Sequence, residues 1–196
     1  MRSFIAIAIV LAQTSTVFAQ EADSATEARS NGDARQRHGW YLAPTAGVTT
    51  VNGEATPEFG LRAAWLINRR FGIGLAGIGW ANGPELEGQS TSGGYGGVLF
   101  QYVFAPESLV HVTTMTILGG GAYCGPTTRS GAHECESSYG FFSSDSTLNL
   151  ELNINDSMRA TLGGGYRFAI AESASPISSQ DLRGFGARTS FEVGQF

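Results

Sequence analysis

The chain has 196 residues, of which 42% are hydrophobic, 15% are charged, 27 are glycine and two are cysteine, and its formal net charge is −5. A chain of this length normally folds as one domain. It is too apolar for a disordered protein, and its charged fraction is well below the roughly 25% of an ordinary soluble protein. Since nucleic acids require a cationic surface, the negative charge argues against a nucleic-acid partner.

The first 19 residues have the layout of an export signal. Arg2 precedes an apolar run over 4–11, and Val17-Phe18-Ala19 forms a small-x-small cleavage site. An amphipathic helix is the alternative, but the run has no polar face. We therefore expect residues 1–19 to be a signal peptide. A lipoprotein anchor is not expected, because residue 20 is Gln rather than Cys.

Short apolar segments follow a polar lead-in. Residues 20–38 contain no large apolar residue, which predicts a disordered stretch. Turn residues then separate eight segments with strand character, at about 40–51, 56–67, 71–82, 93–104, 108–121, 139–154, 158–170 and 182–196. No segment reaches the about 18 to 20 apolar residues of a membrane helix. The pattern predicts an all-β fold over 39–196, an eight-stranded antiparallel up-and-down barrel.

The segments alternate between apolar and polar side chains. Leu150 and Leu152 flank Glu151, and Leu61 and Ala63 flank Arg62. A soluble barrel with an apolar interior would show the same alternation as a membrane barrel with an apolar exterior. The alternation alone therefore does not show whether the apolar face of the sheet points into the barrel or toward a membrane.

Connection lengths favour a membrane barrel. The connections at 68–70, 105–107 and around 155–157 are short, whereas those at 83–92, 122–138 and 171–181 are long. Outer-membrane barrels have short periplasmic turns and long external loops. This arrangement predicts that both termini are periplasmic and that every long loop faces outward.

Aromatic residues gather near the strand ends, as in the two aromatic girdles of membrane barrels. Those expected in the periplasmic girdle are Trp65, Phe71, Tyr102, Phe104 and Phe196, and those expected in the outer girdle are Phe59, Trp80, Tyr95, Tyr139, Phe168 and Phe185. The alternative is that aromatic residues are simply common in strands.

The signal peptide, the eight segments and the ending 191–196 (FEVGQF) together resemble small Gram-negative outer-membrane β-barrels of the OmpA/OmpX-like class. The segments 64–74, 150–154, 165–168 and 181–185 look like an uncharacterised group of such barrels. The resemblance implies a place in the cell outer membrane and an assembly signal at Phe196, read by the barrel-assembly machinery. Phe191 and Val193 have the opposite parity to Phe196, and a bulge at Gly194 would bring all three to one face. The resemblance transfers no catalytic residue.

Charged side chains on the polar faces are expected to fill the lumen. An eight-stranded barrel is only wide enough for its own side chains, and unpaired charges there would be costly. We therefore predict Arg–carboxylate pairs that plug the interior and disfavour a pore. The residues of this network are Arg62, Glu151, Arg159, Arg167, Arg188 and Glu192.

Cys124 and Cys135 lie in the longest loop and predict a disulfide, because an exported chain meets an oxidising compartment. A metal site formed with His133 is the alternative, but zinc usually takes four ligands. The Gly-rich stretches precede no helical pattern, so they do not predict a nucleotide site. No cofactor is expected. Acidic side chains of the outer loops are expected to be solvated, and bridging of divalent cations to lipopolysaccharide is the alternative; they are Glu54, Glu85, Glu87, Glu134, Glu136 and Glu172.

The sequence thus predicts a non-enzymatic outer-membrane protein with an envelope-structural or surface-interaction role. Its expected partners are outer-membrane lipid, lipopolysaccharide and the assembly machinery, and the expected state is a monomer. A lipid A-modifying barrel enzyme is one alternative, although His111 lies at the periplasmic end, away from outer-leaflet lipid. A soluble periplasmic lipocalin-like binding protein, with apolar residues lining a cavity, is the other.

Overall fold

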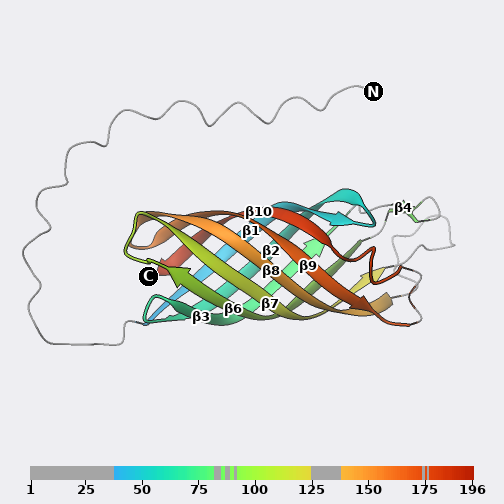
Figure 1. Cartoon of the computed structure of the whole chain (residues 1–196), viewed down its shortest axis with the longest axis horizontal. Coiled ribbons are helices and arrows are strands. Elements are labelled where there is room, and N and C mark those ends of the chain that lie inside the picture. Colours follow the sequence, from blue (N-terminus) through green and yellow to red (C-terminus); the bar gives the residue numbers. More distant parts are fainter. Residues whose placement is uncertain are drawn as a thin grey trace, which may run out of the picture. The chain divides into compact units, whose positions relative to one another are not determined.

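The computed structural model describes residues 38–81, 85–86, 89–90, 92–124, 138–173, 175 and 177–196. Eight of the described strands form a closed antiparallel barrel in the order β1-β10-β9-β8-β7-β6-β3-β2 (Figure 1). They are β1 (His38–Val51), β2 (Glu54–Ile67), β3 (Phe71–Trp80), β6 (Ser92–Phe104), β7 (Val110–Cys124), β8 (Ser138–Asn155), β9 (Met158–Ala171) and β10 (Gly184–Gln195). A separate hairpin pairs β4 (Glu85–Leu86) with β5 (Gln89–Ser90). The predicted fold class and topology are confirmed.

The barrel closes between its first and last strands. β1 pairs with β10 from Trp40↔Gln195 to Thr49↔Gly186 in one constant register, so no bulge occurs at Gly194. Full closure leaves none of these eight strands with an unpaired edge, which removes the usual route to edge-to-edge aggregation.

The barrel has two distinct ends, which we call the turn end and the loop end. The turn end carries the connections 68–70, 105–109 and 156–157, together with the start of β1 and the end of β10. The loop end carries the connections 52–53, 81–91, 125–137 and 172–183. Asn52 and Gly53 both have positive φ (50° and 77°), which is the backbone of a type I′ hairpin turn and explains the Asn-Gly pair. The predicted asymmetry of connection lengths is therefore present.

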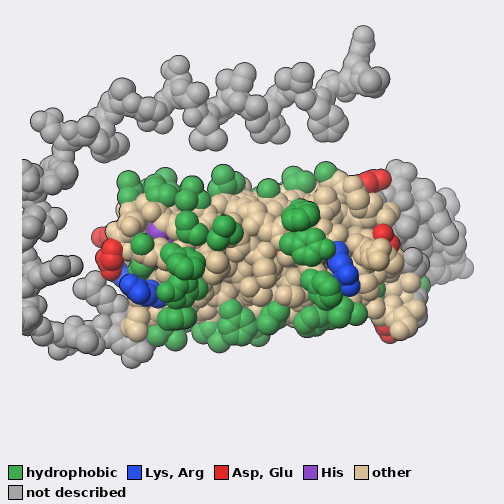
Figure 2. All heavy atoms as spheres, in the orientation of Figure 1, with side chains coloured by type: hydrophobic (Ala, Val, Ile, Leu, Met, Phe, Trp, Pro, Cys, Tyr) green, Lys and Arg blue, Asp and Glu red, His purple; other side chains and the backbone are tan. Residues whose placement is uncertain are grey.

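The outward face of the barrel is apolar. Exposed hydrophobic side chains surround it, and acidic side chains appear at its ends (Figure 2). Leu150, Leu162 and Phe100 are 52%, 64% and 46% exposed. Among the described residues of the eight barrel strands, the exposed charged or histidine side chains are His38 and Glu54, and both lie at strand ends. The outside of the sheet therefore has the character of a protein core.

The described part of the chain contains no helix with the length and hydropathy needed to cross a membrane.

Four of the predicted girdle aromatics point inward, which corrects the sequence analysis. Trp80 and Tyr95 are only 4% exposed, and both belong to the buried cluster. Tyr139 and Phe196 are partly buried against the same cluster. Trp80 is an even number of residues from the buried Ala76 and Ile78, so the alternation of a strand places all three on one face. Nearness to a strand end was a poorer guide than parity.

Candidate functional site: the charged lumen and its cap

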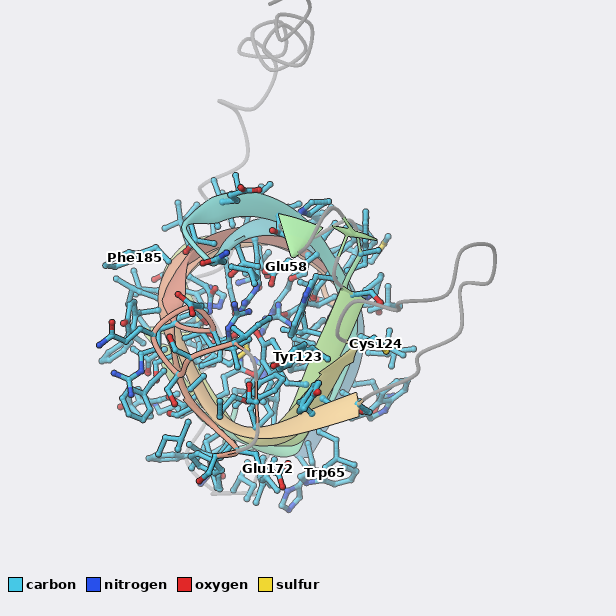
Figure 3. All side chains as sticks on the ribbon, turned by 90° about the vertical axis from the view of Figure 1, so that its right-hand side faces the viewer. Glu58, Trp65, Tyr123, Cys124, Glu172 and Phe185 are labelled. Atoms are coloured by element: carbon cyan, nitrogen blue, oxygen red, sulfur yellow. The ribbon has the colours of Figure 1, made fainter. Side chains whose placement is uncertain are left out.

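The interior of the barrel holds two groups of charged side chains. Viewed from the loop end, Glu58 and Tyr123 point inward, whereas Trp65 and Phe185 lie on the outside (Figure 3). We define the turn-side cluster as Arg62, His111, Glu151, Arg159 and Glu192, and the loop-side cluster as Glu58, Tyr95, Asp145, Arg167 and Arg188. All ten side chains are buried, or nearly so in the case of Arg188.

Arg62 and Glu192 form the central ion pair of the turn-side cluster. Arg62 Nη2 donates to Glu192 Oε1 at 2.9 Å and also to the hydroxyl of Ser190. Arg62 Nη1 donates to the Sδ of Met115 at 3.0 Å. The pair joins β2 to β10 through the lumen, and neither side chain is more than 9% exposed. Each charge therefore depends on the other for compensation.

Glu151 is the second carboxylate of this cluster. His111 Nε2 lies 3.0 Å from its Oε2, Gln101 Nε2 donates to its Oε1 at 3.4 Å, and Arg159 Nη1 lies 3.8 Å from Oε2. The other His111 nitrogen, Nδ1, lies 3.3 Å from the carbonyl oxygen of Ser108. His111 is thus wedged between a carboxylate and a carbonyl, and among the described residues it contacts no serine hydroxyl that it could activate.

The loop-side cluster centres on Arg188. Its guanidinium binds both carboxylate oxygens of Glu58, and Nη1 lies 2.6 Å from Asp145 Oδ2. Nη2 also donates to the Tyr95 hydroxyl at 2.9 Å, and that hydroxyl donates to Asp145. This multidentate geometry suits arginine, whose planar fork matches a carboxylate.

Arg167 differs from the other lumen arginines. It makes no ion pair with a described carboxylate, so the expected Arg–carboxylate pairing is not found for it. Instead Nε donates to the carbonyl of Leu182 at 2.9 Å and Nη2 to the carbonyl of Thr50 at 3.1 Å. Its Cζ lies 5.3 Å from the ring centroids of both Trp80 and Tyr95. Arg167 therefore ties the loop-end backbone to the inward aromatic rings.

Little space remains between the two clusters. A cavity of about 20 Å³ lies in mid-barrel, with Arg62, Met115 and Asn149 among its lining residues and Arg188 at its loop side. A volume of this size holds about one water molecule. The described side chains thus fill the lumen over the height of both clusters.

The described residues of 172–183, namely 172–173, 175 and 177–183, cap the loop end. Ile177 and Leu182 are 3% and 1% exposed, and both belong to the buried cluster. The Tyr123 hydroxyl shares a 2.5 Å hydrogen bond with Ser175 Oγ and accepts one from the Ile177 amide at 3.2 Å. The Asn52 amide donates to the Asp181 carbonyl at 2.6 Å, which ties the cap to the first hairpin. The cap was not predicted, since 171–181 was expected to be a long external loop.

Phe196 closes the opposite end from inside. Its ring stacks on Tyr41 with centroids 6.2 Å apart, and Arg159 Cζ lies 3.7 Å from its centroid. Arg69 Nη2 donates to the main-chain oxygen of Phe196 at 2.6 Å. The prediction that Phe196 belongs to an outward girdle is wrong, because no bulge at Gly194 reverses its parity. Its role as an assembly signal stays a prediction.

Several other predicted residues lie wholly or partly outside the described part of the chain. Cys124 ends β7 and is not a free thiol, but Cys135 is not described, so the disulfide stays a prediction. His133 and three of the six loop acids, Glu87, Glu134 and Glu136, are likewise outside it. No group of three or more His, Cys, Asp or Glu side chains that could hold a metal ion is present among the described residues.

Four members of the two clusters were not predicted from the sequence: Glu58, Tyr95, Asp145, and His111, which shares the inward parity of Met115 on β7. Glu58 lies four residues before Arg62 on β2, and Asp145 lies six residues before Glu151 on β8, so both share the inward parity of a residue that was identified. Tyr95 shares the inward parity of Leu99 on β6. The period-two pattern, extended along each whole strand, predicts the inward position of all four.

No protein-family model matches the sequence, and no curated protein matches it. Among solved structures, the chain is similar to Neisserial surface protein A, with a TM-score of 0.62 and 10% identity over 81% of this chain and 97% of that one. It is also similar to the N-terminal β-barrel domain of OprF from Pseudomonas aeruginosa, with a TM-score of 0.55 and 6% identity over 80% of this chain and 96% of that one. At these identities the likeness concerns the fold: the chain has the fold of the small eight-stranded outer-membrane barrels.

Proposed function

We propose that the protein is a non-enzymatic barrel of the Gram-negative outer membrane with an envelope-structural or surface-interaction role. The observation that carries this proposal is the inversion of the sheet, with the apolar face outside and the charged face inside. In water, the exposed Leu162 and Phe185 would be unfavourable, whereas in a bilayer they contact acyl chains. The turn end is then periplasmic and the loop end external, as in other outer-membrane barrels.

The filled lumen supports a structural rather than a transport role. An ion or solute would have to pass Phe196, two charged clusters and the cap formed by 172–183. Separating a buried charge from its partner costs several kcal/mol. We therefore expect no pore conductance from the folded barrel.

The two alternative functions are less well supported. A lipocalin-like binder needs an apolar cavity, but Leu150, Leu162 and Phe100 face outward and the mid-barrel cavity is small. A lipid A-modifying enzyme needs a reactive group near the outer leaflet, and the described histidines, His38 and His111, lie toward the turn end. A change of lipid A acylation on mutating His111 would favour the enzyme.

The test is the electrophoretic mobility of the protein taken from purified outer membranes. A folded membrane barrel stays compact in detergent without boiling, so the unboiled sample should migrate faster than the boiled one. A soluble periplasmic fraction of the same cells serves as the control and should contain none of the protein. Equal mobility of the two samples, or recovery in the soluble fraction, would contradict the proposal. Planar-bilayer recording of the same material should show no channel steps.

A further inference from the structure

We propose that the outward surface of β8, β9 and β10 toward the loop end binds one phosphate-bearing lipid of the outer leaflet, of the lipid A class. Arg183 would hold the phosphate, and the open groove between Leu148 and Phe185 would hold an acyl chain. This inference rests on the proposed membrane location and names a ligand for that surface.

Arg183 is a cation placed at the rim of the apolar belt. Among the described residues it is the one basic side chain on the outward face of the loop end. Its Nε donates to the carbonyl of Ala169 at 3.0 Å, and its Cζ lies 4.1 Å from the ring centroid of Phe168. These contacts fix the side chain along the barrel wall, at the depth where an aromatic girdle meets lipid headgroups.

The terminal nitrogens of Arg183 are left for a ligand. Neither Nη1 nor Nη2 of Arg183 makes a hydrogen bond or ion pair with a described residue. In contrast, each of the four arginines in the two lumen clusters uses at least one of these atoms to contact a neighbour. A guanidinium with two free donor groups matches the geometry of a phosphate. A basic side chain beside the hydrophobic belt is visible at this end of the barrel (Figure 2).

An open groove of about 610 Å³ lies directly below this cation on the same face. Tyr166 and Phe185 form its upper wall, with ring centroids 5.0 Å apart, and they are cross-strand partners one pleat from Phe168 and Arg183. Leu148 lines the opposite wall. Gly164 forms part of the floor and lies across from Ala187 on β10, so no large side chain fills the depression between the walls.

The groove and the Arg183 guanidinium together indicate which kind of molecule binds this surface. The groove is mostly apolar, although Thr114, Thr116 and Ser146 also line it, and it opens to the bilayer. It therefore suits a hydrocarbon chain, and the cation at its upper end suits an anionic headgroup. A phosphate ester with attached acyl chains supplies both in one molecule. The lipid of the outer leaflet with phosphates at this depth is the lipid A class, whereas a phosphate-free lipid would leave the free donors of Arg183 unpaired.

The experiment titrates full-length protein in detergent micelles with diphosphorylated lipid A and measures bound lipid by native mass spectrometry. Arg183→Gln should weaken binding about tenfold, the loss expected for a charge-assisted hydrogen-bonded pair. Wild-type protein should show a similar loss toward lipid A whose phosphates have been removed. Arg70→Gln, an exposed arginine at the turn end, is the matched control and should leave binding unchanged.

A second pair of variants tests the groove. Gly164→Leu should lower lipid A binding, because its side chain would occupy the groove and its Cβ meets nothing closer than the Gly186 carbonyl at 3.6 Å. Gly77→Leu is the control, since Gly77 is also outward-facing but outside the groove, with no atom within 4 Å of an added Cβ. Should Arg183→Gln fail to fold, Phe168→Leu replaces it, with the same expected direction.

Three results would overturn the inference while leaving the proposed function intact: equal binding of dephosphorylated lipid A, unchanged binding by Arg183→Gln, or binding abolished by EDTA, which would assign the contact to divalent cations on the acidic loops. Each variant is first checked for the faster unboiled mobility. If the unboiled wild-type protein does not migrate faster than the boiled protein, the membrane location itself is refuted.

Discussion

Arg62 is held by Glu192, Ser190 and Met115 in the middle of the lumen, so its removal would strand a buried carboxylate. We expect Arg62→Ala to lower the free energy of unfolding by about 3–5 kcal/mol, the usual cost of breaking a buried pair on one side. Urea titration of the protein refolded into lipid vesicles measures this value.

The double variant Arg62→Met with Glu192→Leu is the informative comparison. It removes both charges and keeps the volume, so it should recover most of the lost stability. The control is Glu107→Ala, which breaks an exposed pair with Arg69 at 3.7 Å and should cost at most about 1 kcal/mol. Equal losses of unfolding free energy in Arg62→Ala, the double variant and Glu107→Ala would mean that the Arg62–Glu192 pair makes no specific contribution to stability.

At the scale of elements, the Tyr123 hydroxyl joins the cap to β7 through its contacts with Ser175 and Ile177. Tyr123→Phe would leave the Ile177 amide, in a residue that is 3% exposed, without its acceptor. An unsatisfied buried amide costs about 1–3 kcal/mol, so hydrogen exchange over 172–183 should speed up about tenfold or more. Tyr166→Phe, on the outward face, is the control and should leave that exchange rate unchanged. Unchanged exchange in Tyr123→Phe would show that the other contacts of the cap hold it without this hydroxyl.

The close approach of β2 to β3 limits which side chains the paired strands can accept. A Cβ added at Gly74 would lie 1.9 Å from the Ala63 carbonyl oxygen and 2.6 Å from the Ala64 Cα, both of them backbone atoms. Gly74→Ala should therefore destabilise the barrel by about 1–3 kcal/mol through overpacking. Gly77→Ala on the same strand has open space and should be close to neutral. Urea midpoints of the two variants, compared in the same vesicles, decide the matter.

For the whole molecule, the apolar outer face of the barrel predicts that a charge placed on it is destabilising. Leu162 lies near the middle of β9 and is 64% exposed, so Leu162→Arg would place a charge against acyl chains. The expected cost is about 2–4 kcal/mol, which should reduce the yield of heat-modifiable barrel on refolding into vesicles. Asp156→Arg, in the exposed 156–157 turn, should refold like the wild type. Normal refolding of Leu162→Arg would argue that this surface does not face lipid.

The barrel architecture could be predicted from the sequence because apolar and polar side chains alternate along most of its strands. Arg62, Glu151 and Glu192 were placed inward from their apolar neighbours, and all three are buried there. Position near a strand end predicts the wrong face for Trp80 and Tyr95, whereas parity with their buried neighbours predicts the inward face on which they lie. The cap could not be predicted, since Ile177 lies in a segment without periodicity and is buried by tertiary contacts alone.

The shared location of His38 and Gln195 at the turn end has a practical meaning. In the proposed orientation, a fluorescent domain or affinity tag fused beyond either strand would lie on the periplasmic side, hidden from antibodies added to intact cells. A short epitope grafted between Asn52 and Gly53, at the tip of the opposite hairpin, would instead be displayed to the medium. The barrel thereby offers a two-sided scaffold whose orientation can be read by labelling living cells.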